Sequence, residues 1–246
     1  MSDNLLALEG VHTHIGAYHI LHGVDLAVPA AGVTMLLGRN GAGKTTTLRT
    51  IMGLWKATRG HIGFDGTAVG GPGVRTSPPD MARQGIAYVP ENMGIFADLS
   101  VKENILLAAR QARSAAQLDT ARLEWIFGFF PALRKFWLYP AGKLSGGQKQ
   151  MPAVPRVIIG PRRPLLVDEP SKGLAPAIIQ NMIDAFIELK QASTTILLVE
   201  QNFNFARQVG DHVAVMDNGR VVHAGGMAEL AQDDALQTRL LGLSLG

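Results

Sequence analysis

The stretch GVTMLLGRNGAGKT, residues 32–45, decides the fold of this chain. Its first six residues form a compact apolar run that predicts a buried strand. A glycine-rich segment follows, and the next residues, KTTTLRTIMGLW at 44–55, fit a helix. Strand, glycine loop and helix in this order predict a loop whose backbone N–H groups face phosphate oxygens, helped by the positive end of the helix.

The loop itself, from Gly38 to Thr45, fits the pattern G-x-x-x-x-G-K-[ST]. In that pattern Lys44 bridges the β- and γ-phosphates and the Thr45 hydroxyl ligates Mg²⁺. The alternative is a glycine-rich turn before an ordinary helix, which the complete spacing and the flanking elements disfavour. The residues expected to bind nucleotide here are Gly38, Arg39, Asn40, Gly41, Ala42, Gly43, Lys44, Thr45 and Thr46.

A second buried strand, PLLVD at 164–168, ends in the adjacent carboxylates Asp168 and Glu169. In a parallel sheet these side chains lie at the same edge as the phosphate loop. We expect Asp168 to reach Mg²⁺ and Glu169 to accept a proton from the water that attacks the γ-phosphorus. An acidic pair at a strand end is usually a solvated turn, so the prediction depends on the upstream loop.

The strand and helix signals in the rest of the sequence predict alternating strands and helices, and therefore a mostly parallel sheet. The Asn218-Gly219 pair predicts a tight hairpin turn. The predicted strands are 5–13, 23–28, 61–64 and 195–200, and the predicted helical stretches are 101–113, 123–137 and 176–191.

Composition bounds the class of protein. The chain has 246 residues, 47% of them hydrophobic, which is enough for a sizeable core. A formal net charge of +3 gives no support to nucleic-acid binding, and the absence of cysteine excludes disulfides and thiol chemistry. The first ten residues do not read as a signal peptide, and no apolar run approaches the ~18–20 residues that cross a bilayer.

A third element, LSGGQ at 144–148, lies between the two nucleotide motifs. Ser145, Gly146, Gly147 and Gln148 offer a hydroxyl and bare N–H groups suited to an anion. This sequence matches the signature of ABC (ATP-binding cassette) ATPases, and the chain resembles that family over nearly its whole length. The resemblance implies that these residues meet the γ-phosphate of ATP bound by an opposite cassette.

Finer features resemble the ATP-binding subunits of bacterial branched-chain amino acid importers. They are VPEN at 89–92, DEPSKGLAP at 168–176 and LVEQN at 198–202. Many ABC ATPases have Gln where Glu91 stands and His where Gln201 stands. The resemblance places Glu91 beside Mg²⁺ and water, and lets Gln201 hydrogen-bond the γ-phosphate without titrating.

Some positions depart from the family pattern. Ile15 aligns with the aromatic residue that stacks on adenine, and we expect Ile15 to pack on the base instead, with Tyr18 as a half-buried strand residue. Pro152 and Pro155 interrupt a helix that the family continues from the signature. Each interior proline costs roughly 3 kcal/mol, so this helix is expected to be kinked, shortened or rebuilt.

Two other groups of residues, a pair of histidines and an aromatic cluster, have ordinary structural explanations. His12 and His14 are expected to be solvated neighbours on one strand, with no third metal ligand evident. An aromatic cluster is expected to be mostly core, with part of it available for docking: Trp125, Phe127, Phe129, Phe130, Phe136 and Trp137.

The resemblance implies a RecA-like α/β phosphate-loop NTPase core with an N-terminal antiparallel β subdomain and a helical insertion. We expect one ABC ATPase domain over 1–246, divided into 1–91, 92–155 and 156–246. It would bind ATP and Mg²⁺, pair with a second ABC ATPase as a homo- or heterodimer, and serve membrane permeases fed by a periplasmic binding protein. Its implied location is peripheral, at the cytoplasmic face of the plasma membrane.

Three alternatives remain open. One is a soluble ABC ATPase that acts on nucleic acid or the ribosome, although such chains commonly carry two cassettes or a long coiled coil. Another is a subunit that binds ATP while its partner supplies hydrolysis. A generic phosphate-loop kinase shares Lys44 and Thr45 but has no need of the 144–148 signature.

Overall fold

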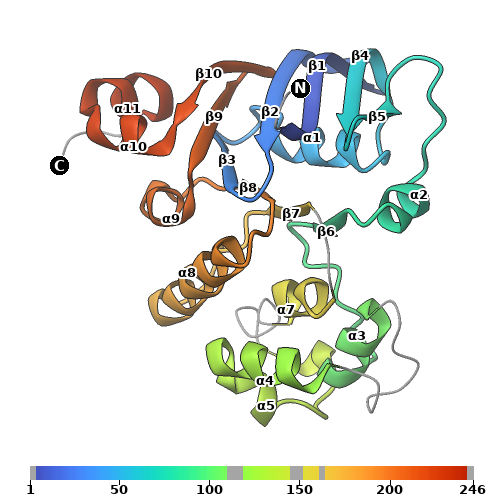
Figure 1. The fold of residues 1–246 in the computed structure, drawn as a ribbon, viewed down its shortest axis with the longest axis vertical. Helices are drawn as coiled ribbons and strands as arrows, with labels where there is room; N and C mark the ends of the chain where they lie inside the picture. Colours follow the sequence, from blue (N-terminus) through green and yellow to red (C-terminus); the bar gives the residue numbers. More distant parts are fainter. Residues whose placement is uncertain (1–3, 110–118, 145–151, 161–163, 243–246) are drawn as a thin grey trace.

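The computed structural model describes residues 4–109, 119–144, 152–160 and 164–242 (Figure 1). The described residues form two sheets. A group of helices, which comes between two strands along the chain, lies apart from the antiparallel sheet in Figure 1. Among the described residues, none of the helices combines the length and the apolar character that crossing a bilayer requires.

An antiparallel sheet forms the N-terminal part, with strand order β2-β1-β4-β5. Its inward positions are filled by Leu6, Leu8 and Val11 on the first strand, which alternate with less buried neighbours. This confirms the strands predicted at 5–13, 23–28 and 61–64, although all three are longer than expected. The strands are β1 (Asn4–Ile15), β2 (Tyr18–Pro29), β4 (Ala57–Phe64) and β5 (Thr67–Gly70).

The second sheet has six strands in the order β10-β9-β3-β8-β7-β6. Every residue of β3, β7 and β8 is buried, as expected for parallel strands covered on both faces. The predicted hairpin is present, with positive φ at both Asn218 and Gly219. The strands are β3 (Val33–Gly38), β6 (Ala87–Val89), β7 (Leu165–Asp168), β8 (Ile196–Val199), β9 (His212–Asp217) and β10 (Arg220–Gly226).

Among the described residues, six helices accompany the two sheets. The long one coincides with the predicted 176–191, whereas the first ends earlier than predicted, since Gly53 takes a positive φ of 71° just after it. Helix, strand and sheet order together confirm the RecA-like α/β class. The helices are α1 (Lys44–Ile51), α2 (Pro78–Arg83), α8 (Pro176–Gln191), α9 (Phe203–Val209), α10 (Met227–Gln232) and α11 (Asp234–Leu241).

A helical region follows β6 and precedes β7. Pro131 divides the predicted 123–137 stretch into two helices, so that Phe130 both ends one helix and precedes the next. Phe130 and Phe127 are buried in the cluster that also holds the central strands, as predicted, whereas the other four aromatic residues are only partly buried against it: Trp125, Phe129, Phe136 and Trp137. The elements are α3 (Val101–Ala108), α4 (Thr120–Phe129), α5 (Pro131–Lys135), η2 (Ala141–Lys143) and α7 (Ala153–Ile158). The boundaries at 91 and 155 stay predictions.

The two prolines lie where a helix tolerates them. Pro152 is the N-cap of α7, and Pro155 is the third residue of its first turn. The first N–H groups of a helix have no intrahelical acceptor, so proline loses no hydrogen bond there. The first such bond comes from the Arg156 N–H to the Pro152 carbonyl at 3.1 Å. The interior cost expected from sequence therefore does not apply to α7 as described.

Candidate functional site

The phosphate loop connects β3 to α1, and glycine makes its path possible. Gly38, Gly41 and Gly43 have φ values of 143°, 80° and 105°, which side chains rarely adopt. A Cβ on Gly38 would also collide with the carbonyl oxygen of Met216 on β9. The hairpin tip supports the loop from outside, because the Gly219 N–H donates to the Ala42 carbonyl at 2.9 Å. The Gly219 carbonyl in turn accepts from the His22 N–H of β2 at 2.9 Å.

Lys44 starts α1 and lies along this loop. Its Nζ donates to the carbonyl oxygens of Gly38 and Arg39 at 2.7 and 3.1 Å. The side chain is 5% exposed and lies 3.8 Å from the Glu169 Oε1 atom. Burial lowers the pKa of Lys44, while Glu169 opposes that shift. The cation is therefore held at the loop by carbonyls and one carboxylate.

Thr45 and Asp168 meet across the ends of β3 and β7. The Thr45 hydroxyl donates to Asp168 Oδ1 at 3.1 Å, and the Tyr88 hydroxyl lies 3.5 Å from Oδ2. Burial raises the pKa of Asp168 to about 6, against the opposing effect of the Thr45 hydrogen bond. A hydroxyl and a buried carboxylate side by side are the oxygen donors that Mg²⁺ takes. The residues present therefore fit a divalent cation bound with a nucleotide.

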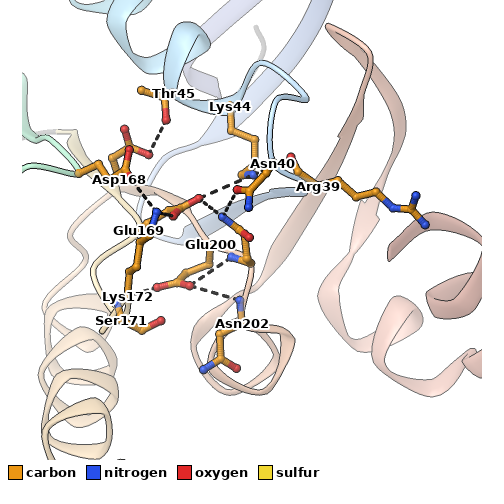
Figure 2. A network of polar contacts seen from close by, with 12 residues as sticks. Arg39, Asn40, Lys44, Thr45, Asp168, Glu169, Ser171, Lys172, Glu200 and Asn202 are labelled. Atoms are coloured by element: carbon orange, nitrogen blue, oxygen red, sulfur yellow. Dashed lines mark hydrogen bonds and ion pairs between the residues drawn. The ribbon is translucent and has the colours of Figure 1, made fainter. Parts of the chain in front are cut away.

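Glu169 lies at the centre of Figure 2, between the loop and the end of β8. Its φ is +48°, a conformation that costs energy for a residue with a Cβ and is often found at functional sites. Gln201 Nε2 donates both to Glu169 Oε1 and to Asn40 Oδ1, the latter at 2.6 Å. Gln201 thus ties the carboxylate to the phosphate loop. Arg39 extends away from this cluster in Figure 2.

Glu200 is a buried residue that sequence reasoning passed over. It is 2% exposed, and its carboxylate accepts from the N–H groups of Ser171, Gln201 and Asn202 at 2.9, 3.2 and 3.3 Å (Figure 2). Burial raises its pKa, against these hydrogen bonds. The carboxylate joins the turn after β7 to the segment after β8. The sequence signal that could have identified Glu200 is its position inside the LVEQN motif at 198–202.

Glu91 follows β6 and faces the same site. Its Oε1 accepts from Lys172 Nζ at 2.6 Å, and Lys172 Nζ lies 3.3 Å from Glu169 Oε2. Lys172 lies within the DEPSKGLAP motif at 168–176, where the sequence alone predicts no role for it.

The cavity beside the loop measures about 360 Å³. Glu91, Glu169 and Lys44 line it, as do Ile20 and members of the loop. Ile15 is half-buried and is not among the lining residues, so its contact with adenine stays a prediction. Tyr18 is 75% exposed rather than half-buried, because it stands at the β1–β2 turn, where no element covers it.

A larger cavity of about 760 Å³ lies elsewhere, beside β4, β5 and residues 70–77. It contains Lys56 and Arg75, and its one carboxylate, Asp80, is already engaged by Ser77 and Arg83. The smaller cavity brings together a lysine, a hydroxyl and two carboxylates, so the chemistry points to that one.

Histidines gather on the outer face of β1 and β2. His12 and His14 do not stand alone: the ring of His19 stacks on both, and His22 contacts His19 at a centroid distance of 4.0 Å. In the part of the chain that the structure describes, no group of three or more His, Cys, Asp or Glu side chains is arranged to hold a metal.

The signature residues Ser145, Gly146, Gly147 and Gln148 lie outside the described residues. Their predicted contact with a nucleotide on an opposite cassette stays a prediction. The structure brings residues of the phosphate loop together with Asp168, Glu169, Gln201 and Glu91, whereas the Arg39 side chain points away. The loop residues that line the cavity are Asn40, Gly41, Gly43, Lys44, Thr45 and Thr46.

Comparisons with known proteins agree with this geometry. The sequence profile described as ABC transporter matches residues 21–172. The high-affinity branched-chain amino acid transport ATP-binding protein BraG of Pseudomonas aeruginosa is 34% identical over 97% of this chain and 100% of its own length. A probable branched-chain amino acid transport ATP-binding protein, LivF of Archaeoglobus fulgidus, is 33% identical over 92% and 93%.

Solved structures show the same fold. One titled as the ATP-binding subunit of an ABC transporter superposes with a TM-score of 0.77 and 28% identity, covering 98% of this chain and 95% of that one. The sequence profile and the relatives match the part of the chain that contains the phosphate loop and the carboxylates described above. The chain therefore belongs to the ABC transporter family, as one of its ATP-hydrolysing nucleotide-binding cassettes.

Proposed function

We propose that this cassette is the motor subunit of an amino-acid importer, in which Glu169 serves as the general base for ATP hydrolysis. One observation supports it above all. Lys44, Thr45 and Glu169 line one cavity at the ends of β3 and β7. Asp168 is hydrogen-bonded to Thr45, and Gln201, which follows β8, is hydrogen-bonded to Glu169. Burying so many polar groups at one edge of a sheet costs free energy, which a purely structural role does not explain.

The loop and Lys44 bind the phosphates in this proposal. Backbone N–H groups at the start of α1 face the anion, and Lys44 neutralises the charge that grows between the β- and γ-phosphates. Thr45, Asp168 and Glu91 would hold Mg²⁺, which supplies charge neutralisation to the phosphate oxygens. Asn40 fixes Gln201 through its 2.6 Å hydrogen bond and so holds the Gln201 amide near the position of the γ-phosphate.

Glu169 removes a proton from the attacking water. Its carboxylate is 8% exposed and held from two sides, so it is already oriented before the water arrives. Gln201 shares Glu169 Oε1 and donates its other hydrogen to Asn40. An amide cannot titrate, so its contribution is geometric and does not vary with pH.

Partners complete the motor. We infer a second ABC cassette, identical or related, whose residues matching 145–148 meet the γ-phosphate bound here. Membrane permeases would dock on the helical region, where Leu107, Leu138 and Tyr139 are 63%, 73% and 43% exposed. The Val101 N–H donates to the Tyr139 carbonyl, so the 138–139 segment lies beside the start of α3. Exposed apolar side chains of this kind mark interaction surfaces.

The cargo follows from the relatives. Both curated relatives named above are transport proteins for branched-chain amino acids by their printed names. We therefore propose leucine, isoleucine and valine, delivered by a periplasmic binding protein, with the cassette peripheral on the cytoplasmic face. Uptake of labelled leucine by vesicles with the full assembly, set against arginine, tests this. Arginine uptake without leucine uptake would contradict the assignment.

The hydrolysis proposal is tested with MgATP turnover and Glu169→Gln. The variant is expected to bind ATP while its turnover falls by about 10²–10⁴-fold, the usual contribution of a general base. Glu188→Gln, an exposed position on α8, is the matched control and should leave turnover unchanged.

Two results would contradict the proposal. Equal turnover by Glu169→Gln and the unaltered chain would remove Glu169 as the base. ATP binding without turnover, alone or in the assembly, would favour the alternative of a binding-only subunit.

A further inference from the structure

Lys172 occupies the turn that follows the proposed general base. Its N–H donates to the Glu169 carbonyl oxygen at 3.2 Å, which closes a tight turn over residues 169–172. Buried Glu200 stabilises this turn, because its carboxylate accepts a hydrogen bond from the Ser171 N–H at 2.9 Å. The backbone therefore presents the Lys172 side chain on the same side as the Glu169 carboxylate.

The Lys172 ammonium lies between two carboxylates from different loops. Its Nζ is 2.6 Å from Glu91 Oε1 and 3.3 Å from Glu169 Oε2. Glu91 follows β6, at the entrance to the helical region, and Glu169 follows β7. Lys172 therefore connects the loop leading into the helical region with the residue that activates water.

The two oxygens of Glu169 have separate partners. Oε1 accepts from Gln201 and lies 3.8 Å from Lys44, whereas Oε2 faces Lys172. The carboxylates of Glu91 and Glu169 both contact the same ammonium, so without Lys172 two neighbouring like charges would repel each other. Glu169 is also held in a costly positive-φ conformation, so its orientation depends on these contacts.

We propose that Lys172 is a positioning residue for hydrolysis: it bridges Glu91 and Glu169, offsets their mutual repulsion and fixes the second oxygen of the general base. This rests on the proposed function of Glu169. Its two ion pairs are with Glu91 and Glu169, and Glu169 acts on the attacking water, so the effect of Lys172 is expected mainly on turnover.

The test is Lys172→Met in the full chain, with Lys172→Arg beside it. Met keeps the length of the side chain and removes its charge. Turnover at saturating MgATP is expected to fall by about 10²-fold, the typical consequence of a misplaced catalytic group, with KM for MgATP within about threefold. Arg keeps the charge and should restore most of the turnover.

A matched control is available on α8. Lys190 Nζ pairs with Asp211 at 2.6 Å, a lysine–carboxylate pair of similar geometry away from the site. Lys190→Met should leave turnover within about twofold of the unaltered chain, as expected for a partly exposed ion pair. Thermal unfolding of all three variants separates loss of fold from loss of positioning.

A second variant identifies the cause. Glu91→Gln alone also alters a proposed Mg²⁺ ligand, so its own loss of turnover is measured first. If Lys172 acts by offsetting the charge of Glu91, the double variant Lys172→Met/Glu91→Gln should lose less turnover than the two single losses combined, since the repulsion disappears. Simple additivity of the two losses would exclude charge offset as the cause.

The outcomes also separate this inference from the one it rests on. Loss of turnover in Glu169→Gln with normal turnover in Lys172→Met would overturn the role of Lys172 and leave the general base in place. Normal turnover in Glu169→Gln, or none in the unaltered chain, would overturn both.

Discussion

The phosphate edge of the central sheet and the helical region between β6 and β7 are built on different principles. At the phosphate edge, polar side chains are fixed by backbone geometry: positive-φ glycines shape the loop, and strand ends aim Asp168 and Glu169. In the helical region, short helices are held by packing around Phe127 and Phe130. A change at the edge should therefore affect chemistry first, and a change among the helices should affect stability first.

The largest expected effect is on the packing side. Phe130→Ala removes a ring that is 2% exposed at the junction of α4 and α5, so the free energy of unfolding should fall by about 3–5 kcal/mol. Urea unfolding measures this. Phe96→Ala, at a side chain 56% exposed, is the control and should stay within about 1 kcal/mol. Equal losses in the two variants would show that the α4–α5 junction is not a packed core.

The matching change at the phosphate edge is Lys44→Ala. Turnover should fall by about 10²–10³-fold, because a preorganised cation facing the phosphates is lost. Steady-state ATPase assays measure it, with the exposed Lys56→Ala as control. Unfolding stability should change far less than in Phe130→Ala. A stability loss as large as that one would break the contrast between the two regions.

A smaller effect concerns pH. The pKa of Asp168, about 6, lies above the ordinary value, so the stability contributed by its neutral form is complete below about pH 4 and is lost as pH rises through 6. Without Mg²⁺, Asp168→Asn should therefore be more stable than the unaltered chain at pH 7.5, by at most about 3 kcal/mol, the equivalent of two pKa units. Unfolding curves from pH 5 to 8 should converge toward the acid end. A constant difference across this range would assign the effect to another group.

The smallest effect tests the prolines. Pro155→Ala should lower stability by less than about 1 kcal/mol, because proline in the first turn of α7 costs no hydrogen bond and stiffens the unfolded chain. If Pro155 were in a helix interior, the same change would instead stabilise the chain by roughly 3 kcal/mol. Thermal unfolding decides between the two signs.

Sequence alone predicted the parts of the molecule that local pattern determines. The loop at 38–45, the Asp168–Glu169 pair, α8 and the Asn218-Gly219 hairpin depend on glycine, strand burial or helical spacing over short stretches. The site residues that sequence missed depend on contacts between distant segments. Lys172 reaches Glu91, 81 positions away, and Glu200 reaches the Ser171 N–H, 29 positions away.

The misplaced features have different causes. The early end of α1 at Ile51 follows from Gly53, a local helix-ending residue inside the predicted stretch. The exposure of Tyr18 depends on which neighbours cover a residue, and no periodic pattern encodes that. The position of Pro152 at the start of α7, which makes it harmless, depends on where the helix begins, the least certain feature of any sequence-based reading.

The Gly219 peptide unit has a consequence for engineering this chain. It joins the nucleotide loop near residue 42, the N-terminal sheet at His22 and the C-terminal hairpin through two hydrogen bonds, and any Cβ there would strike the Ile20 carbonyl. An affinity tag, fluorophore or peptide graft inserted at this exposed-looking turn would loosen the ATP-binding loop from nearly 180 residues away.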